Sequence, residues 1–172
     1  LSSSRALKLV TEKYGGKYFS SAVGEVNVVK QMKLCNAIIG GEGNGGIIYP
    51  ESHYGRDSIV GVALFLSLLS EKKMKCSELR SSYPSFFMSK NKIQLNDEID
   101  IKKILSEIAN KYSHEKVNTL DGVKIDFADK WVHLRTSNTE PIIRIYSESY
   151  SKSDADLLAN RFIDEINALL KH

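Results

Sequence analysis

Helical and strand-like hydrophobic patterns alternate over the first half of the chain. Apolar residues that recur every three or four positions predict three helices, over residues 4–14, 26–34 and 58–72. Short apolar runs between these stretches predict strands, at residues 17–20, 36–39 and 47–49. Alternation of this kind favours an α/β domain in which helices cover a mixed sheet.

The pattern changes after a polar, lysine-rich strand that ends near Leu95. Helical spacing then predicts one helix over residues 97–112 and another that opens at Ser153 with a capping box. Three strand-like runs lie between these helices, at residues 123–127, 131–135 and 142–147. Because the first two are joined by only three residues, we expect them to form an antiparallel hairpin. The predicted organisation is an α/β domain over residues 1–92 and a small α+β domain with an antiparallel sheet over residues 96–172.

Composition and charge narrow the class of protein. The chain has 172 residues, of which 42% are hydrophobic, and this is enough to bury a core in one or two domains. Its 24 basic and 21 acidic residues give a net charge of +3 and are spread along the whole sequence. No segment has the charge pattern of a nucleic-acid arm or a membrane-surface patch, so we expect neither kind of partner.

Cysteine usage and the longest apolar stretch suggest a cytoplasmic protein. Cys35 and Cys76 are far apart, match no metal spacing and occur without a signal-peptide pattern, which favours free thiols. The apolar stretch over residues 59–69 is shorter than the roughly 20 residues that span a bilayer. The sequence starts at Leu1 rather than at a methionine and soon enters a helical pattern, so we expect it to be a piece of a longer protein.

A glycine cluster follows the second predicted strand of the first domain. Five of the seven residues from Gly40 to Gly46 are glycine, which lets the backbone approach a ligand closely and leaves Glu42 and Asn44 as the displayed side chains. A carboxylate accepts hydrogen bonds and an amide both donates and accepts them, and this pair suits adjacent sugar hydroxyls. A glycine-rich turn without a ligand explains the composition equally well. A nucleotide loop is disfavoured because no Lys-Ser or Lys-Thr pair follows.

A second polar segment, Arg135-Thr136-Ser137-Asn138-Thr139-Glu140-Pro141, joins two predicted strands. Arg135 offers a planar fork for a phosphate, and Ser137, Asn138 and Thr139 add short donors. Arg144 has the strand spacing needed to point toward the same anion. An ordinary polar turn with surface arginines is the alternative.

At these two segments the chain resembles the α-D-phosphohexomutase family of phosphoglucomutases, phosphomannomutases and phosphoglucosamine mutases. Residues 135–141 are similar to the phosphate-binding loop of the family's fourth domain, and the segment from Gly41 to Gly45, with Glu42, Gly43 and Asn44, is similar to the sugar loop of its third. The resemblance covers essentially the whole chain and includes Asp121-Gly122-Val123 ahead of the hairpin.

The resemblance implies an isomerase that moves a phosphoryl group between O1 and O6 of a hexose, through a bisphosphate intermediate. It implies that Arg135, Ser137, Asn138, Thr139 and Arg144 hold the distal phosphate, and that Glu42, Gly43 and Asn44 contact the sugar. It also implies a phosphoserine and a Mg²⁺ site in the first two domains of the parent chain. Neither motif occurs in this sequence, so we expect it to contain no catalytic or metal-binding residues, to bind no cofactor and to be inactive alone. A free-standing sugar-phosphate binding module is the alternative.

Departures from the family pattern bear on the choice of hexose. Glu25 stands where some mannomutase-type members have a histidine, and an acidic residue there resembles phosphoglucosamine mutases. Glu25 is either a partner for the ammonium of glucosamine 6-phosphate or a helix-start residue favoured by the helix dipole. Asp57 is expected to cap a helix, while the roles of His53 and Arg56 stay open.

Overall fold

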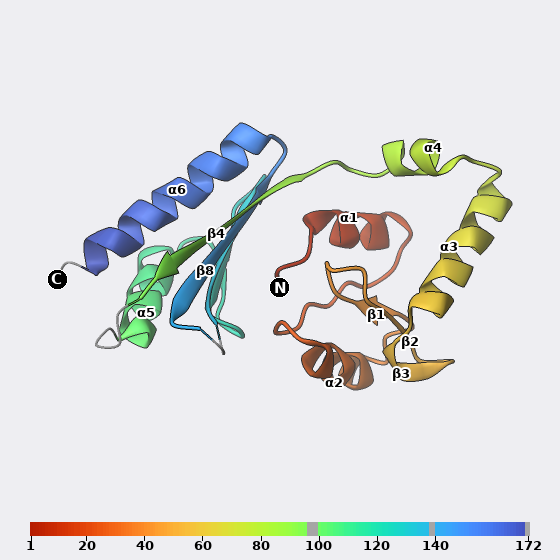
Figure 1. The fold of residues 1–172 in the computed structure, drawn as a ribbon, viewed down its shortest axis with the longest axis horizontal. Helices are drawn as coiled ribbons and strands as arrows, with labels where there is room; N and C mark the ends of the chain where they lie inside the picture. Colours follow the sequence, from red (N-terminus) through yellow and green to blue (C-terminus); the bar gives the residue numbers. More distant parts are fainter. Residues whose placement is uncertain (96–99, 138–139, 171–172) are drawn as a thin grey trace. The chain divides into compact units, whose positions relative to one another are not determined.

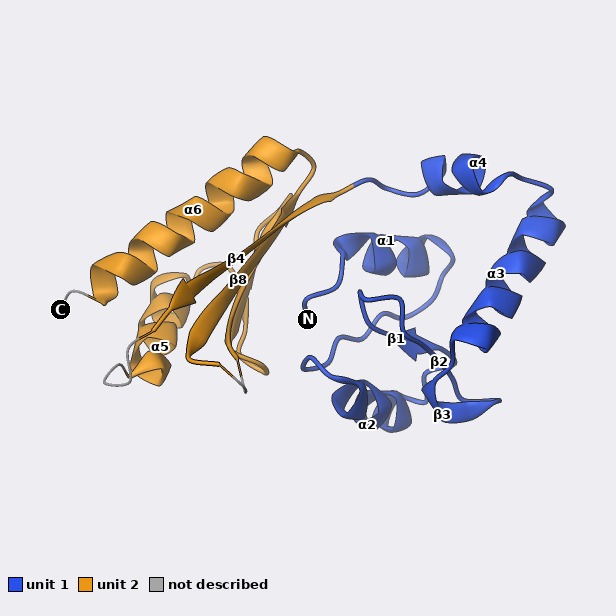
Figure 2. Ribbon diagram, in the orientation of Figure 1, with its two compact units in different colours: residues 1–85 blue, residues 86–172 orange. Residues whose placement is uncertain are grey.

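The computed structural model describes residues 1–95, 100–137 and 140–170, and the chain forms two compact units, Leu1–Ser85 and Phe86–His172 (Figure 2). Unit 1 contains four helices and a small sheet (Figure 1). Its elements are α1 (Arg5–Lys13), α2 (Glu25–Cys35), β1 (Gly40–Gly41), β2 (Ile47–Tyr49), β3 (His53–Arg56), α3 (Ser58–Lys72) and α4 (Cys76–Ser81). The three strands pair in the order β1-β2-β3.

Local signals explain where the helices of unit 1 begin and end. The Ser4 hydroxyl accepts a hydrogen bond from the Ala6 amide at the start of α1, and Asp57 caps α3 as predicted. Helix α2 ends at Asn36, which adopts the left-handed conformation common at helix C-termini. Val28 and Met32 of α2 pack on Ile48 of β2 and form the small core of this unit.

The sheet of unit 1 differs from the prediction in two respects. Both of its strand pairings are antiparallel, so it is not the mixed sheet that the alternating pattern suggested. Residues 17–20 form no strand, and the strand expected at residues 36–39 begins only at Gly40. The α/β class itself is confirmed, since helices and a sheet make up the unit.

The described residues of unit 2 form a five-stranded antiparallel sheet with two helices on one face (Figure 1). Its elements are β4 (Phe87–Gln94), α5 (Ile101–Lys111), β5 (Lys116–Asn118), β6 (Val123–Asp126), β7 (Trp131–Thr136), β8 (Ile142–Ser149) and α6 (Lys152–Leu169). The strand order is β4-β8-β7-β6-β5, and the predicted hairpin is β6-β7. The α+β class with an antiparallel sheet is confirmed.

Alternate residues of each strand in unit 2 face the helices and form one core. Val132 and Leu134 of β7 pack in this core with Ile143 and Ile145 of β8, and Phe162 of α6 is completely buried among them. The other residues of the same strands lie on the opposite face of the sheet. Ser151 rather than Ser153 caps α6, by accepting a hydrogen bond from the Asp154 amide.

The predicted boundary between the domains has to move toward the N-terminus. We expected the lysine-rich strand to close the first domain, but β4 pairs along its whole length with β8, from Phe87 opposite Ser149 to Gln94 opposite Ile142. The structure therefore divides the chain between Ser85 and Phe86. The paired residues are 48 (Gln94 and Ile142) to 62 (Phe87 and Ser149) positions apart, so the hydrophobic pattern of β4 alone does not reveal the pairing.

Both cysteines are unpaired, and the apolar helix α3 is not buried. Cys35 and Cys76 are free thiols, as expected. Helix α3 is apolar on most sides, yet none of its residues is buried, and Ile59 is 80% exposed. Over the described ranges, the structure has no helix with both the length and the apolar character needed to cross a membrane.

A polar network ties the end of α5 to α6 in unit 2. The Tyr112 hydroxyl donates to Glu165 Oε1 (2.6 Å) and accepts from Arg161 Nη2 (2.7 Å), while Lys111 Nζ donates to Glu165 Oε2 (2.9 Å). Burial, reinforced by the hydrogen bond to Glu165, raises the pKa of Tyr112 to about 12. Ionisation of this hydroxyl would remove its donated hydrogen bond.

We predict that this network makes unit 2 sensitive to alkaline pH. The folded state holds the Tyr112 proton up to about pH 12, whereas the unfolded chain releases it near pH 10, so the stabilisation is complete below about pH 10 and declines above it. Tyr112→Phe should lower stability at pH 7 by about 1–2 kcal/mol and remove this tyrosine's share of the alkaline decline. Denaturant unfolding at several pH values, followed by the fluorescence of Trp131, measures both effects. Parallel pH curves for the two proteins would contradict the prediction.

Candidate functional site

The glycine cluster of unit 1 forms a tight connection between β1 and β2. The Glu42 amide donates to the Gly46 carbonyl, and the Gly45 amide donates to the Glu42 carbonyl, both at 3.1 Å. A side chain at position 41 would collide with the Gly46 carbonyl oxygen, and Gly45 has a φ of +92°. Glycine is therefore required at both positions for the turn to close.

The two displayed side chains of this loop each make one contact within the protein. Glu42 Oε1 accepts a hydrogen bond from the Gly24 amide (3.0 Å), and Asn44 Oδ1 accepts one from the Gly46 amide (3.0 Å). Glu42 Oε2 and Asn44 Nδ2 have no hydrogen-bond partner among the described residues. One acceptor and one donor thus remain for a ligand. Gly43 lies between these residues and runs next to Ser3.

Glu25 pairs with Arg56 of strand β3. It is the first residue of α2, and its carboxylate accepts from the Arg56 backbone amide (3.1 Å) and from Arg56 Nε (2.8 Å). These contacts, the backbone amide first, lower the pKa of Glu25. The position at the start of α2 fits the alternative that the helix dipole favours this residue, and it leaves less of the carboxylate for an ammonium group.

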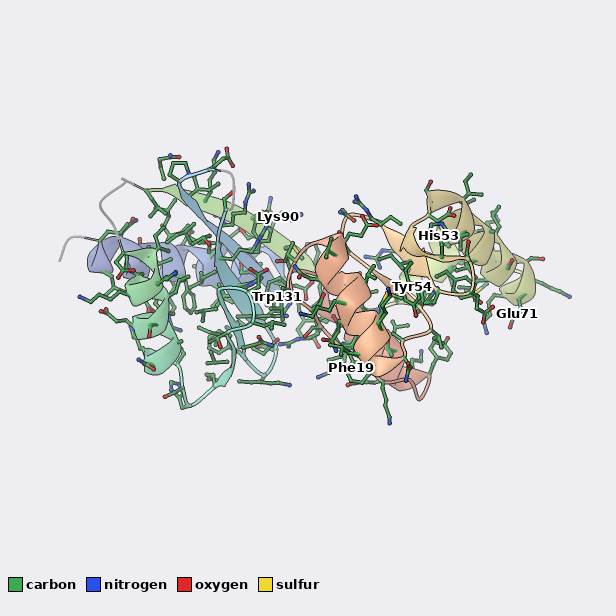
Figure 3. All side chains as sticks on the ribbon, turned by 90° about the horizontal axis from the view of Figure 1, so that it is seen from below. Phe19, His53, Tyr54, Glu71, Lys90 and Trp131 are labelled. Carbon is green, nitrogen blue, oxygen red and sulfur yellow. The ribbon has the colours of Figure 1, made fainter. Side chains whose placement is uncertain are left out.

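His53 of β3 and Asp57, which directly follows that strand, form a second pair. His53 Nε2 lies 3.1 Å from Asp57 Oδ2, and Asp57 Oδ1 accepts from the amides of Ile59 and Val60 (His53 is labelled in Figure 3). The Val60 amide, followed by His53, lowers the pKa of Asp57. Asp57 is thus a helix cap that also orients His53. Unit 1 brings together the glycine loop, the loop before α2 and strand β3.

In unit 2 the predicted phosphate loop connects β7 to β8. The Ser137 amide donates to the Ile142 carbonyl (3.1 Å), and the Leu95 amide at the end of β4 donates to the Pro141 carbonyl (2.9 Å). Three strands therefore meet at this loop. The predicted ligands Asn138 and Thr139 lie outside the described residues.

Arg135 and Arg144 lie directly opposite each other on β7 and β8. Both are on the sheet face that points away from α5 and α6, because their neighbours Leu134 and Ile145 are in the core. Arg144 Nη2 donates to Glu140 Oε2 (3.1 Å), whereas Arg135 Nε is buried and has no hydrogen-bond partner in the described part of the chain. A buried donor without a partner costs about 1–3 kcal/mol, which an anion at this position would recover.

Gly122 allows the backbone to pass directly behind Arg135. Its φ is +70°, and a side chain there would collide with the Leu134 carbonyl oxygen and lie 2.8 Å from Arg135 Cα. His133 Nε2 donates to the Asp121 carbonyl (2.6 Å) and so holds the same turn. His133 is therefore structural, and so is Trp131, which is completely buried and donates to Glu148 (2.7 Å).

We predict that Gly122→Ala destabilises the protein more than a change in backbone conformation alone would. Gly15 is the matched control, because its φ is +75° and a side chain there meets nothing within 4 Å. Gly15→Ala should cost about 1–2 kcal/mol for the left-handed conformation. Gly122→Ala should cost more, because the backbone behind Arg135 has to move, and anion binding should weaken with it. Thermal unfolding followed by circular dichroism compares the two, and equal losses would contradict the prediction.

Sequence spacing identified the two loops but missed the contacts that hold them. Glu42 and Gly24 are 18 residues apart, and Glu25 and Arg56 are 31 apart, so no local pattern links them. The described residues contain no group of three or more histidine, cysteine or acidic side chains arranged to hold a metal ion. Asp100 instead caps α5 by accepting a hydrogen bond from the Lys103 amide (3.2 Å).

Comparison with known proteins gives matches over nearly the whole chain. Residues 1–86 match the model of phosphoglucomutase/phosphomannomutase α/β/α domain III, and residues 91–165 match that of the C-terminal domain. A phosphoglucomutase/phosphomannomutase of Thermococcus kodakarensis is 36% identical over 90% of this chain and 34% of its own. A phosphoglucosamine/phosphogalactosamine mutase of Sulfurisphaera tokodaii is 33% identical over 99% of this chain and 37% of its own.

The solved structures agree on the fold. The crystal structure of a phosphoglucomutase/phosphomannomutase family protein from Burkholderia thailandensis superposes with a TM-score of 0.76, at 22% identity, over 95% of this chain and 35% of the other. The chain spans about a third of the length of the curated relatives that it matches.

Proposed function

The chain belongs to the phosphoglucomutase/phosphomannomutase family, and from this premise we propose that it is the substrate-binding half of a phosphohexomutase. In the proposed reaction, a phosphoryl group moves between O1 and O6 of a hexose through a bisphosphate intermediate. The phosphoserine and the Mg²⁺ loop would lie in the preceding two domains of the parent chain. No cluster among the described residues fits Mg²⁺, so we assign it no step in this chain.

The unpartnered Nε of Arg135 is the observation that carries the proposal. Arg135 and Arg144 are directly opposite each other, on the same face of the sheet, at the loop that also contains Ser137, Asn138 and Thr139. Two like charges in direct register destabilise a sheet unless an anion lies between them. A phosphate dianion bound there would neutralise both and would accept the Arg135 Nε hydrogen bond.

Unit 1 would bind the sugar in this proposal. The free acceptor of Glu42 and the free donor of Asn44 match two neighbouring hydroxyls, and Gly43 between them lets the ring approach the backbone. Phosphoryl transfer depends mainly on positioning and charge neutralisation. Contacts to the sugar and to the non-reacting phosphate would therefore assist the reaction by positioning the substrate, even though they take no part in the chemistry. Glu25, paired with Arg56, would shape this loop rather than select an amino sugar.

Titration of the 172-residue chain with glucose 1,6-bisphosphate, glucosamine 6-phosphate and unphosphorylated glucose tests the proposal. We expect the bisphosphate and the monophosphate to bind and to shift the NMR signals of the loop residues, and glucose to bind far more weakly. Binding that does not depend on the phosphate would contradict the role of the Arg135 loop.

A further inference from the structure

A third cation lies in line with the two arginines of the phosphate loop. On the face of the sheet that points away from the helices, Lys92 of β4 is directly opposite Arg144 of β8, and Arg144 is directly opposite Arg135 of β7. Neighbouring strands are about 4.8 Å apart, so the three Cα atoms span roughly 10 Å. Their long side chains can reach a common point above the sheet.

The charges of this row are not balanced within the described part of unit 2. Arg144 pairs with Glu140, but Lys92 is exposed and Arg135 Nε has no partner. The two other carboxylates that the strand register places on this face, Glu148 and Asp126, lie two residue pairs further along the strands, about 13 Å away between Cα positions. Glu148 instead accepts a hydrogen bond from Trp131 Nε1, and Asp126 pairs with Lys124, so neither carboxylate forms an ion pair with the row.

The net charge of the row matches a phosphate group. Three cations less the Glu140 carboxylate leave a charge of +2, and a phosphate monoester carries close to −2 at pH 7. The row also lies at the phosphate loop, because the end of β4 is tied to it by the hydrogen bond from the Leu95 amide to the Pro141 carbonyl. A third strand, β4, therefore also borders the site, although it lies outside the Arg-Thr-Ser-Asn-Thr-Glu-Pro segment.

We propose that Lys92 is a further phosphate-binding residue, whose ammonium group contacts the same phosphate as Arg135 and Arg144. The inference rests on the proposed function, because it extends the phosphate site of that function onto strand β4. It also accounts for a row of like charges that the unliganded protein would otherwise maintain at a cost in stability.

Lys90 provides a matched control two residues away. It lies on the same strand and the same face and carries the same charge, but it is opposite Tyr146 and stacks over that ring at 5.6 Å (Lys90 is labelled in Figure 3). Lys92→Gln and Lys90→Gln therefore make equal changes in net charge, and only the first removes a member of the cation row.

The experiment is a calorimetric or NMR titration of the 172-residue chain and its variants with glucose 1,6-bisphosphate. We expect Lys92→Gln to weaken binding about tenfold, Lys90→Gln to weaken it less than threefold, and Lys92→Arg to retain most of the affinity. The unliganded Lys92→Gln protein should unfold at the same or a higher temperature than the wild type, because the repulsion is relieved. Weaker binding without lost stability separates a ligand contact from a structural role.

Equal losses of affinity for Lys92→Gln and Lys90→Gln would overturn the proposal, since they would indicate a general effect of charge. The proposal would also be overturned if Lys92→Gln bound with wild-type affinity while Arg135→Ala abolished binding. That result would leave the proposed function intact. No binding by the wild-type chain would overturn both.

Discussion

Arg135→Ala is expected to weaken binding of glucose 1,6-bisphosphate by about 100-fold or more. The substitution removes a guanidinium fork and, with it, the buried Nε that no described residue satisfies. Each hydrogen bond to a charged group contributes about 1.5–3 kcal/mol, and every 1.4 kcal/mol is tenfold in affinity. Loss of two such bonds accounts for the expected change, which calorimetry on the 172-residue chain would measure.

Two further variants separate the effect of the planar guanidinium group of Arg135 from the effect of its positive charge. Arg135→Lys keeps the positive charge but not the planar pair of donors, so it should recover only part of the affinity. Arg80→Ala removes one positive charge from unit 1. Among the described residues the Arg80 guanidinium donates only to the Ser85 hydroxyl (3.4 Å), so this variant should bind like the wild type. Wild-type affinity in Arg135→Ala would disprove the phosphate role of this loop.

The elements predicted correctly from the sequence are those with local signals. Ser4 and Asp57 cap helices in the structure because a side-chain oxygen next to an apolar helical pattern satisfies free amides at that helix start. The hairpin between β6 and β7 follows from a short connection between two alternating runs. Each of these features is determined within a few residues, so the sequence pattern is sufficient.

Sheet membership and the geometry of the site depend instead on distant pairing. β4 carries the same alternation whichever sheet it joins, and only its register with Ile142–Ser149 assigns it to unit 2. The direct alignment of Lys92, Arg144 and Arg135 follows from that register and is invisible in the order of the residues. The sequence thus identified Arg135 and Arg144 as candidates, while the row that includes Lys92 required the fold.

Phe162→Ala is expected to cost about 3–5 kcal/mol of the stability of unit 2. Phe162 is completely buried in the core between the sheet and α6, and its ring lies 5.1 Å from that of Tyr112. Truncation removes the buried ring and leaves a cavity that the surrounding side chains fill only in part. A typical domain is stable by only about 5–15 kcal/mol, so the loss is a large fraction of the total.

Leu157→Ala on the same helix is the matched control, since Leu157 is 66% exposed and its truncation should change stability by no more than about 0.5 kcal/mol. Trp131 is the single tryptophan of the chain and lies in β7, so its fluorescence in denaturant titrations reports on unit 2.

At temperatures where Phe162→Ala remains folded, its affinity for glucose 1,6-bisphosphate should equal that of the wild type, because the cation row lies on the opposite face of the sheet from this core. A loss of affinity as large as that in Arg135→Ala would mean that the core sets the register of the cation row. Similar stabilities for Phe162→Ala and Leu157→Ala would place Phe162 outside the core that holds α6 to the sheet.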